Sequence, residues 1–180
     1  MYEGSNKTAL LSQKLITEAM LRLLENKAFS EINVSDICRE ADVSRQTFYT
    51  NFGSKDNVII HILSCNCRYT PVQKQQACRG KSFRDFCEGY SRYIIEHRRI
   101  IELLVRNDMI RYLYDMQYRE FLQCDHFVHD IQGYERQYLV DFIAGGLSGI
   151  AKNYILTGGT ADEAFLTELM LRLFGGEYFR

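Results

Sequence analysis

The sequence has few residues that break helices, and it has no long apolar run. Its 180 residues include one proline, and 46% of them are apolar. This composition favours a packed, mostly helical protein of one large or two small domains over a disordered chain. No apolar run approaches the roughly 20 residues that cross a bilayer, and the N-terminus lacks a secretory signal. We therefore expect a cytoplasmic protein with no membrane partner.

A zinc-binding cysteine pattern is also missing. The six cysteines form no repeated CxxC, and the single-residue gap between Cys65 and Cys67 suits zinc poorly. We interpret the cysteines as reduced thiols, and we expect neither a metal site nor a cofactor. The alternative is a thiol or metal sensor that uses Cys65 and Cys67.

The chain lacks the positive charge that is typical of a small nucleic-acid binder. Its 22 basic residues face 23 acidic ones, for a net charge of −1. Charge must therefore be examined locally. The segment "VSRQTFYTNFGSK", residues 43–55, contains two basic residues and no acidic one.

The apolar spacing of the first 69 residues predicts four helices. The first covers residues 7–27, and Asn33 is a plausible N-cap for a short second helix. Asp42 stands where a tight turn needs a residue that tolerates positive φ. Ser44 can cap a third helix to about residue 52, and Gly53 can end it before a fourth over 55–69. Two short helices joined by so short a turn form a helix-turn-helix.

A polar segment at residues 70–80 contains the only proline and marks the boundary between two modules. Helical periodicity then continues over 82–97, 98–107, 109–124, 134–157 and 160–174, whereas 125–133 reads as loop. We predict an all-α fold with a three-helix DNA-binding domain at 1–54, a connecting helix at 55–69 and a larger C-terminal helical bundle domain at 81–180.

The helix predicted at 134–157 combines an apolar stripe with three glycines. Each glycine inside a helix costs about 1 kcal/mol relative to alanine, so close approach of another helix is the expected compensation. That helix can belong to the same chain or to a second copy. In the second case the interface of the dimer consists of Phe142, Gly145, Gly146, Gly149, Ala151, Phe165, Leu169 and Leu173.

Residues 32–59, "INVSDICREADVSRQTFYTNFGSKDNVI", resemble the N-terminal domain of TetR-type (tetracycline-repressor-like) transcriptional regulators. The segment "FIAGGLSGIAKNYILTGG", residues 142–159, also resembles the dimerising helix of a subgroup common in Firmicutes. Two positions depart from the family pattern: Asp42 replaces a frequent glycine, and Gln46 replaces a frequent small residue. The second departure places a long amide on the DNA-facing surface.

The resemblance implies a homodimeric repressor that binds a palindromic double-stranded DNA operator and is released by a small-molecule effector. It implies phosphate contacts from Thr47, Tyr49 and Lys55. Arg45, Gln46 and Thr50 are the candidate base readers in the major groove. Ser44 is a cap or a contact, and so is Asn51.

The C-terminal aromatic residues are candidates for the lining of the effector pocket, or they are plain core. The candidates are Tyr90, Tyr93, His97, Tyr112, Tyr118 and Phe121. An enzyme with Cys124 as nucleophile beside His126 or His129 lacks any oxyanion signature, so we expect no enzymatic activity. A transcriptional activator with a protein partner remains an alternative to the repressor.

Overall fold

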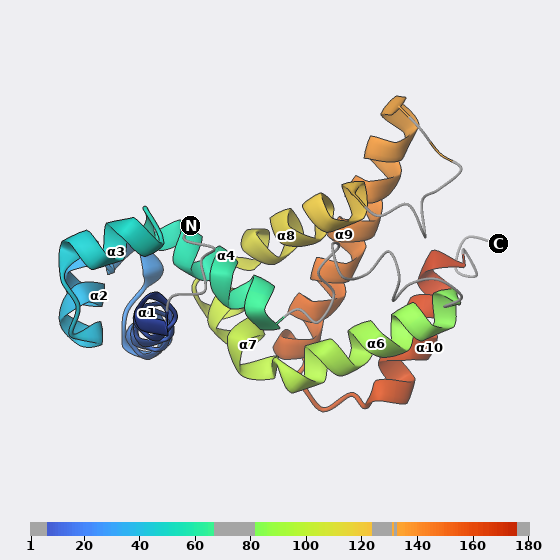
Figure 1. The fold of residues 1–180 in the computed structure, drawn as a ribbon. Helices are drawn as coiled ribbons and strands as arrows, with labels where there is room; N and C mark the ends of the chain where they lie inside the picture. Colours follow the sequence, from blue (N-terminus) through green and yellow to red (C-terminus); the bar gives the residue numbers. More distant parts are fainter. Residues whose placement is uncertain (1–6, 67–81, 124–130, 132, 176–180) are drawn as a thin grey trace. The chain divides into compact units, whose positions relative to one another are not determined.

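The computed structural model describes residues 7–66, 82–123, 131 and 133–175. The chain divides into two compact units, residues 1–66 and 67–180. Within the described ranges the regular structure consists of nine α-helices and one short 3-10 helix, with no strand (Figure 1). The prediction of an all-α fold is confirmed. No helix in these ranges has the length and apolar character that a membrane span requires.

The N-terminal unit is a small helical bundle. It contains α1 (Lys7–Asn26), the 3-10 helix η1 (Phe29–Glu31), α2 (Val34–Ala41), α3 (Arg45–Asn51) and α4 (Lys55–Asn66). Helix α1 packs against α2, α3 and α4, and α2 packs against α3 (Figure 1). The core of this bundle is apolar and fully buried, and its largest side chains include Ile16, Met20, Ile37, Phe48, Phe52 and Leu63.

Local signals fix where α2 begins and ends and where α3 ends. The side chain of Asn33 accepts a hydrogen bond from the backbone N–H of Asp36 at 2.9 Å and caps α2. Asp42 follows α2 with φ 52° and ψ 48°, the left-handed conformation that the sequence predicted for it. Gly53 ends α3 with φ +72°, a conformation that glycine adopts without steric cost.

The described part of the C-terminal unit, residues 82–123 and 133–175, contains five helices. They are α6 (Phe83–Glu96), α7 (Arg98–Arg106), α8 (Ile110–Leu122), α9 (Gly133–Leu156) and α10 (Glu163–Phe174). Helix α8 lies along α9, α6 lies along α10, and α7 packs against α9 (Figure 1). Helix α10 begins three residues later than the periodicity indicated, because the side chain of Asp162 caps it by accepting a hydrogen bond from the backbone N–H of Phe165.

Candidate nucleic-acid interface

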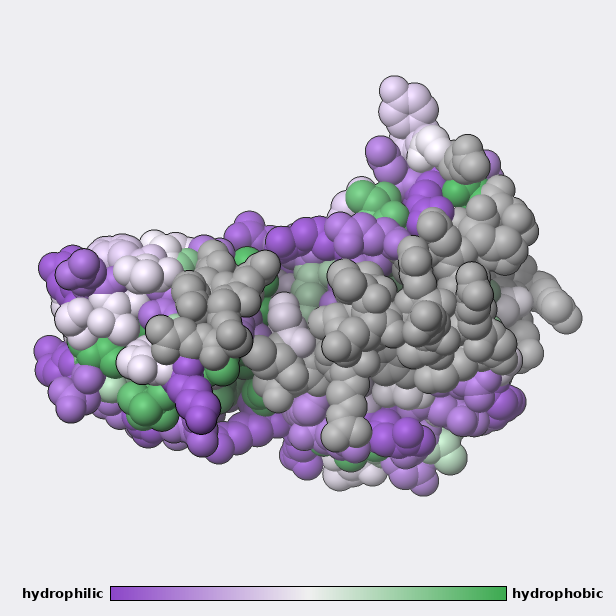
Figure 2. Space-filling view, in the orientation of Figure 1, coloured by the Kyte–Doolittle hydropathy of each residue, from purple (hydrophilic) through white to green (hydrophobic). Residues whose placement is uncertain are grey.

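The outward face of α3 carries a compact group of polar side chains. Arg45, Gln46, Tyr49 and Thr50 are all exposed, and Tyr49 is 48% exposed. Positions four apart lie on the same side of a helix, so these residues share one surface. In Figure 2 the surface over α3 is mostly purple to white. Phe48 points the other way and is fully buried, so the helix is divided into a packing face and a polar face.

Ser44 and Thr47 begin this helix. The Ser44 hydroxyl oxygen accepts a hydrogen bond from the backbone N–H of Thr47 at 3.0 Å. The two side-chain hydroxyl groups lie 2.8 Å apart. Of the two roles that the sequence left open for Ser44, the structure shows the cap, which typically stabilises a helix by about 1 kcal/mol.

Asn51 does not belong to the exposed face, although the sequence placed it among the candidate DNA contacts. It is 4% exposed, and its side-chain amide donates a hydrogen bond to the carbonyl oxygen of Thr47 at 2.8 Å. A buried side chain at the end of α3 cannot reach DNA without unfolding the last turn. Asn51 therefore has a structural role in the helix, which corrects the sequence-based assignment.

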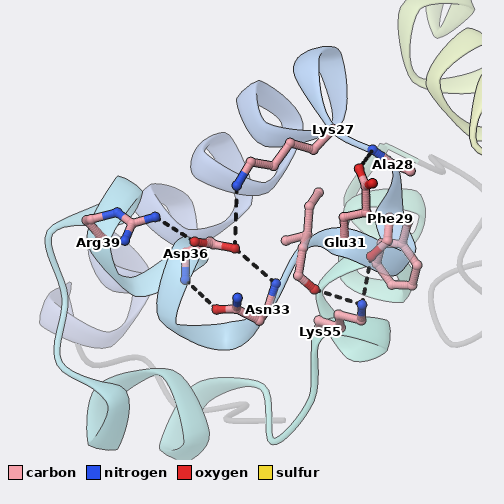
Figure 3. A network of polar contacts seen from close by, with 9 residues as sticks. Lys27, Ala28, Phe29, Glu31, Asn33, Asp36, Arg39 and Lys55 are labelled. Carbon is pink, nitrogen blue, oxygen red and sulfur yellow. Dashed lines mark hydrogen bonds and ion pairs between the residues drawn. The ribbon is translucent and has the colours of Figure 1, made fainter.

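Lys55, the predicted phosphate contact, is held inside the unit. Its ammonium group donates hydrogen bonds to the carbonyl oxygens of Phe29 at 2.7 Å and Ile32 at 2.8 Å (Figure 3). It also lies 4.3 Å from the centroid of the Phe29 ring. An ammonium group has only three donors, so two are already used. Lys55 ties the first turn of α4 to the connection between α1 and α2.

Asp36 organises the other side of the same connection. Its carboxylate accepts a hydrogen bond from the backbone N–H of Asn33 at 3.3 Å and pairs with Arg39 at 2.5 Å and Lys27 at 3.7 Å (Figure 3). The Asn33 hydrogen bond, together with these two cations, lowers the pKa of Asp36. The start of α2 is therefore fixed to the end of α1 by a charged cluster that stays ionised at neutral pH.

Helix α4 also supports the inner end of α3. The ring of His61 lies edge-on to Phe52, with centroids 5.3 Å apart. Burial lowers the pKa of His61 below its usual value of 6.5. The imidazole is therefore mainly neutral at pH 7 and packs as an apolar ring behind the polar face.

This four-helix arrangement matches a known family. Residues 16–62 match the model of the bacterial regulatory proteins of the tetR family. The matched residues begin inside α1 and end inside α4, so they include the helix-turn-helix described above. The N-terminal unit is therefore similar to the DNA-binding region of the tetR family.

Two curated HTH-type transcriptional regulators are similar to part of this chain. One is the HTH-type dhaKLM operon transcriptional activator DhaS of Lactococcus lactis subsp. lactis, 36% identical over 53 residues, or 29% of this chain and 28% of that protein. The other is the HTH-type transcriptional regulator EthR of Mycolicibacterium smegmatis, 48% identical over 42 residues, or 23% of this chain and 19% of that protein. The matches thus span less than a third of either relative.

Solved structures resemble the whole fold at low sequence identity. A crystal structure of Lin0861 from Listeria innocua has a TM-score of 0.81 and 15% identity, over 100% of this chain and 97% of that chain. NalD, the secondary repressor of a multidrug efflux pump in Pseudomonas aeruginosa, has a TM-score of 0.60 and 17% identity, over 92% and 94%. These likenesses concern the fold alone, and they include the C-terminal unit as well as the N-terminal unit.

The structure separates the predicted pocket residues into two groups. On α6, the rings of Tyr90 and Tyr93 are stacked 5.8 Å apart, and His97 lies edge-on to Tyr93 at 4.7 Å. Phe121 joins this group through Phe86 at 5.6 Å. The second group lies on α8, where Tyr118 stacks on Tyr114 and where Tyr112 is half-buried beside Arg111.

The predicted interface residues also separate into two groups. Ala151 is fully buried inside the chain, so it cannot contact a second copy, and its assignment to the interface is wrong. A Cβ at Gly146 would lie 3.1 Å from the Phe174 ring, so this glycine accommodates a helix of the same chain. Gly145 and Gly149 have no such neighbour within 4 Å. The remaining positions are half-buried or exposed at the surface: Phe142, Phe165, Leu169 and Leu173.

Several residues named from the sequence lie outside the described part of the chain. These are Cys67, Cys124, His126 and His129, together with the side chain of Cys65. Two residues that the sequence reasoning missed are Phe86 and Gln117, both buried in the C-terminal unit. A signal for Gln117 existed, because it occupies the apolar stripe of α8 between Leu113 and Phe121.

Proposed function

We propose that this chain is a homodimeric transcriptional regulator that binds a palindromic operator through α3. The observation that carries the proposal is the exposed polar face of α3, which holds Arg45 and no acidic residue and stands on the second helix of a helix-turn-helix. Such a helix enters the major groove in proteins of this architecture. Because the chromosome is its partner, we place the protein in the cytoplasm and assign it no enzymatic activity.

The side chains of α3 can be assigned to two kinds of DNA contact. Arg45 can donate two hydrogen bonds to guanine, and Gln46 can pair with adenine, so both are base readers together with Thr50. Thr47 and the exposed Tyr49 are phosphate contacts, assisted by the backbone N–H groups at the start of α4. Because Lys55 is held by two carbonyl groups, Arg45 supplies the side-chain cation of this surface.

We propose that residues 1–54 form the DNA-binding domain, that 55–69 connect it, and that 81–180 bind the effector and form the dimer. Two large apolar side chains support the dimer, because Phe142 is 60% exposed and Phe165 is 55% exposed. A two-fold symmetric dimer matches a palindromic operator. We assign the protein as a repressor that a small molecule releases from its operator. The second candidate is a transcriptional activator that works with a protein partner, because the similar protein DhaS is an activator.

The salt dependence of operator binding tests the proposal. A duplex selected from a random pool should be palindromic, and the logarithm of its binding constant should fall linearly with the logarithm of salt concentration. Tyr49→Ala should weaken binding to every duplex by about tenfold, because a phosphate contact carries no base information. Its neutral hydroxyl releases no counterion, so the salt slope should stay unchanged. Binding without sequence preference or salt dependence would reject the proposal.

Gln46→Ala should change operator preference at one base pair per half-site. A bidentate amide–adenine pair contributes about 1–3 kcal/mol of discrimination, so its loss should reduce the preference at that position by about tenfold or more. A gel shift over all single-base operator variants measures this, with Tyr49→Ala as the matched control for uniform weakening. If Gln46→Ala weakens all variants equally, Gln46 is not a base reader.

A further inference from the structure

A buried glutamine in the C-terminal unit holds a hydrogen-bond acceptor that no group in the described part of the chain satisfies. Gln117 of α8 is 4% exposed. Its side-chain Nε2 donates to the hydroxyl of Tyr90 on α6 at 2.6 Å, and that hydroxyl donates to the carbonyl oxygen of Leu147 on α9 at 3.1 Å. The other end of the amide, Oε1, is buried without a partner. One amide thus connects three helices and leaves a single acceptor unused.

The unused acceptor has an energetic cost. Leaving a buried oxygen without a hydrogen bond costs about 1–3 kcal/mol. The orientation of the amide is set by the contact with Tyr90, because Nε2 must donate to the hydroxyl that already donates to Leu147. A group that donates a hydrogen bond to Oε1 would therefore remove this cost.

The surroundings of Gln117 are aromatic and apolar. Leu113 and Phe121 lie one turn to either side of it on α8. Phe121 meets the ring of Phe86 edge-on at 5.6 Å, and Phe86 stacks on Tyr90 at 6.3 Å. The Tyr90 hydroxyl and the Leu147 carbonyl oxygen are the other polar atoms of this contact, so a buried water molecule, which needs two to four polar partners, is the competing occupant. An aromatic molecule could pack against the same rings and still donate one hydrogen bond.

The charges of the buried side chains limit which class of ligand could bind here. The polar side chains that the structure describes as buried in this unit are all uncharged: Ser91, Gln117, Ser148 and Thr167. Ser91 and Thr167 pair with each other at 3.0 Å, and Ser148 donates to the carbonyl oxygen of Gly145 at 3.1 Å. A charged ligand would lose its hydration here without gaining an opposite charge from any of these four side chains. The site therefore suits a neutral molecule.

We propose that Oε1 of Gln117 accepts a hydrogen bond from the hydroxyl or N–H group of an uncharged aromatic ligand, which packs against the Phe86–Tyr90–Phe121 rings. That this ligand is the effector rests on the proposed function. The binding itself does not depend on DNA, so the two claims can be tested separately.

Phenol and anisole are matched probes, because anisole replaces the hydroxyl donor with a methoxy group. Calorimetry on the full chain should show phenol binding about tenfold more tightly than anisole, the value of one buried hydrogen bond. Benzoate, which is charged, should not compete. Gln117→Met keeps a similar volume and removes the acceptor, so it should abolish the preference for phenol. Gln123→Met, at the exposed end of α8, is the control and should retain it.

Equal affinities of the natural chain for phenol and anisole, or binding of neither, would overturn the proposal and leave a water molecule as the partner of Oε1. This comparison needs no variant, so it stands even if Gln117→Met fails to fold. A phenol preference that survives in a folded Gln117→Met chain would also overturn it. A gel shift separates the binding site from its role in regulation. If the chain prefers phenol but phenol does not release the operator, the site is supported and its effector role is rejected. If the chain binds the operator but does not prefer phenol, only the site is rejected.

Discussion

Replacing Lys55 with methionine is expected to destabilise the N-terminal unit by about 2 kcal/mol and to leave the salt slope of operator binding unchanged. Two charge-assisted hydrogen bonds, to Phe29 and Ile32, and a cation–π contact with Phe29 are lost together. Urea unfolding followed by circular dichroism measures the first effect. Hydrogen exchange should show faster opening of residues 28–33, the segment that Lys55 holds.

The salt slope decides between the two roles of Lys55. A lysine that contacts a phosphate releases a counterion, so its removal should reduce the slope by about 0.9. Lys14→Met is a matched control, because Lys14 is an exposed lysine of α1 with only a 3.9 Å ion pair to Glu18. A smaller slope with unchanged stability in Lys55→Met would restore the phosphate role that the family resemblance implies.

Placing aspartate at Phe142 and Phe165 together is expected to convert the protein to monomers and to weaken operator binding at least about a hundredfold. Burying one phenylalanine contributes about 1.5–3 kcal/mol, and a two-fold interface contains each residue twice. Each introduced carboxylate would also be desolvated. Analytical ultracentrifugation measures the association, and a gel shift measures operator affinity.

Leu11→Asp provides the control for this double variant. Leu11 is a similarly exposed apolar residue, but it lies on α1 in the N-terminal unit. It should leave the oligomeric state unchanged. A dimer that persists with both phenylalanines replaced would show that α9 and α10 do not form the interface, and the assignment of Gly145 and Gly149 to it would fail as well.

The fold could be predicted from the sequence because its signals are local. Asn33 and Ser44 cap helices through side-chain contacts three residues away, and Asp42 adopts its positive φ within one turn. The apolar spacing of α1 likewise predicts which of its residues are buried, including Ile16 and Met20. Signals of this range can be followed along the chain without knowing its tertiary structure.

The roles of individual site residues could not be predicted in the same way. Lys55 is separated from Phe29 by 26 positions, so only the folded chain shows that its ammonium group is engaged. Asn51 carries a hydrogen-bonding side chain like its neighbours on α3, but its position on the helix turns it inward. On α9, Ala151 and Gly145 are both small, and only packing shows that the first is buried and the second is open.

The two-sided construction of α3 has a consequence for evolution and engineering. A seven-residue helix is not stable alone, so its existence depends on Phe48, Phe52 and the Ser44 cap. The exposed positions 45, 46, 49 and 50 contribute little to that stability. With the DNA contacts that we propose for α3, point mutations can therefore change operator preference while the fold is conserved. In the role that we propose for α3, positions 45, 46 and 50 are the ones to vary in order to retarget this protein to new promoters.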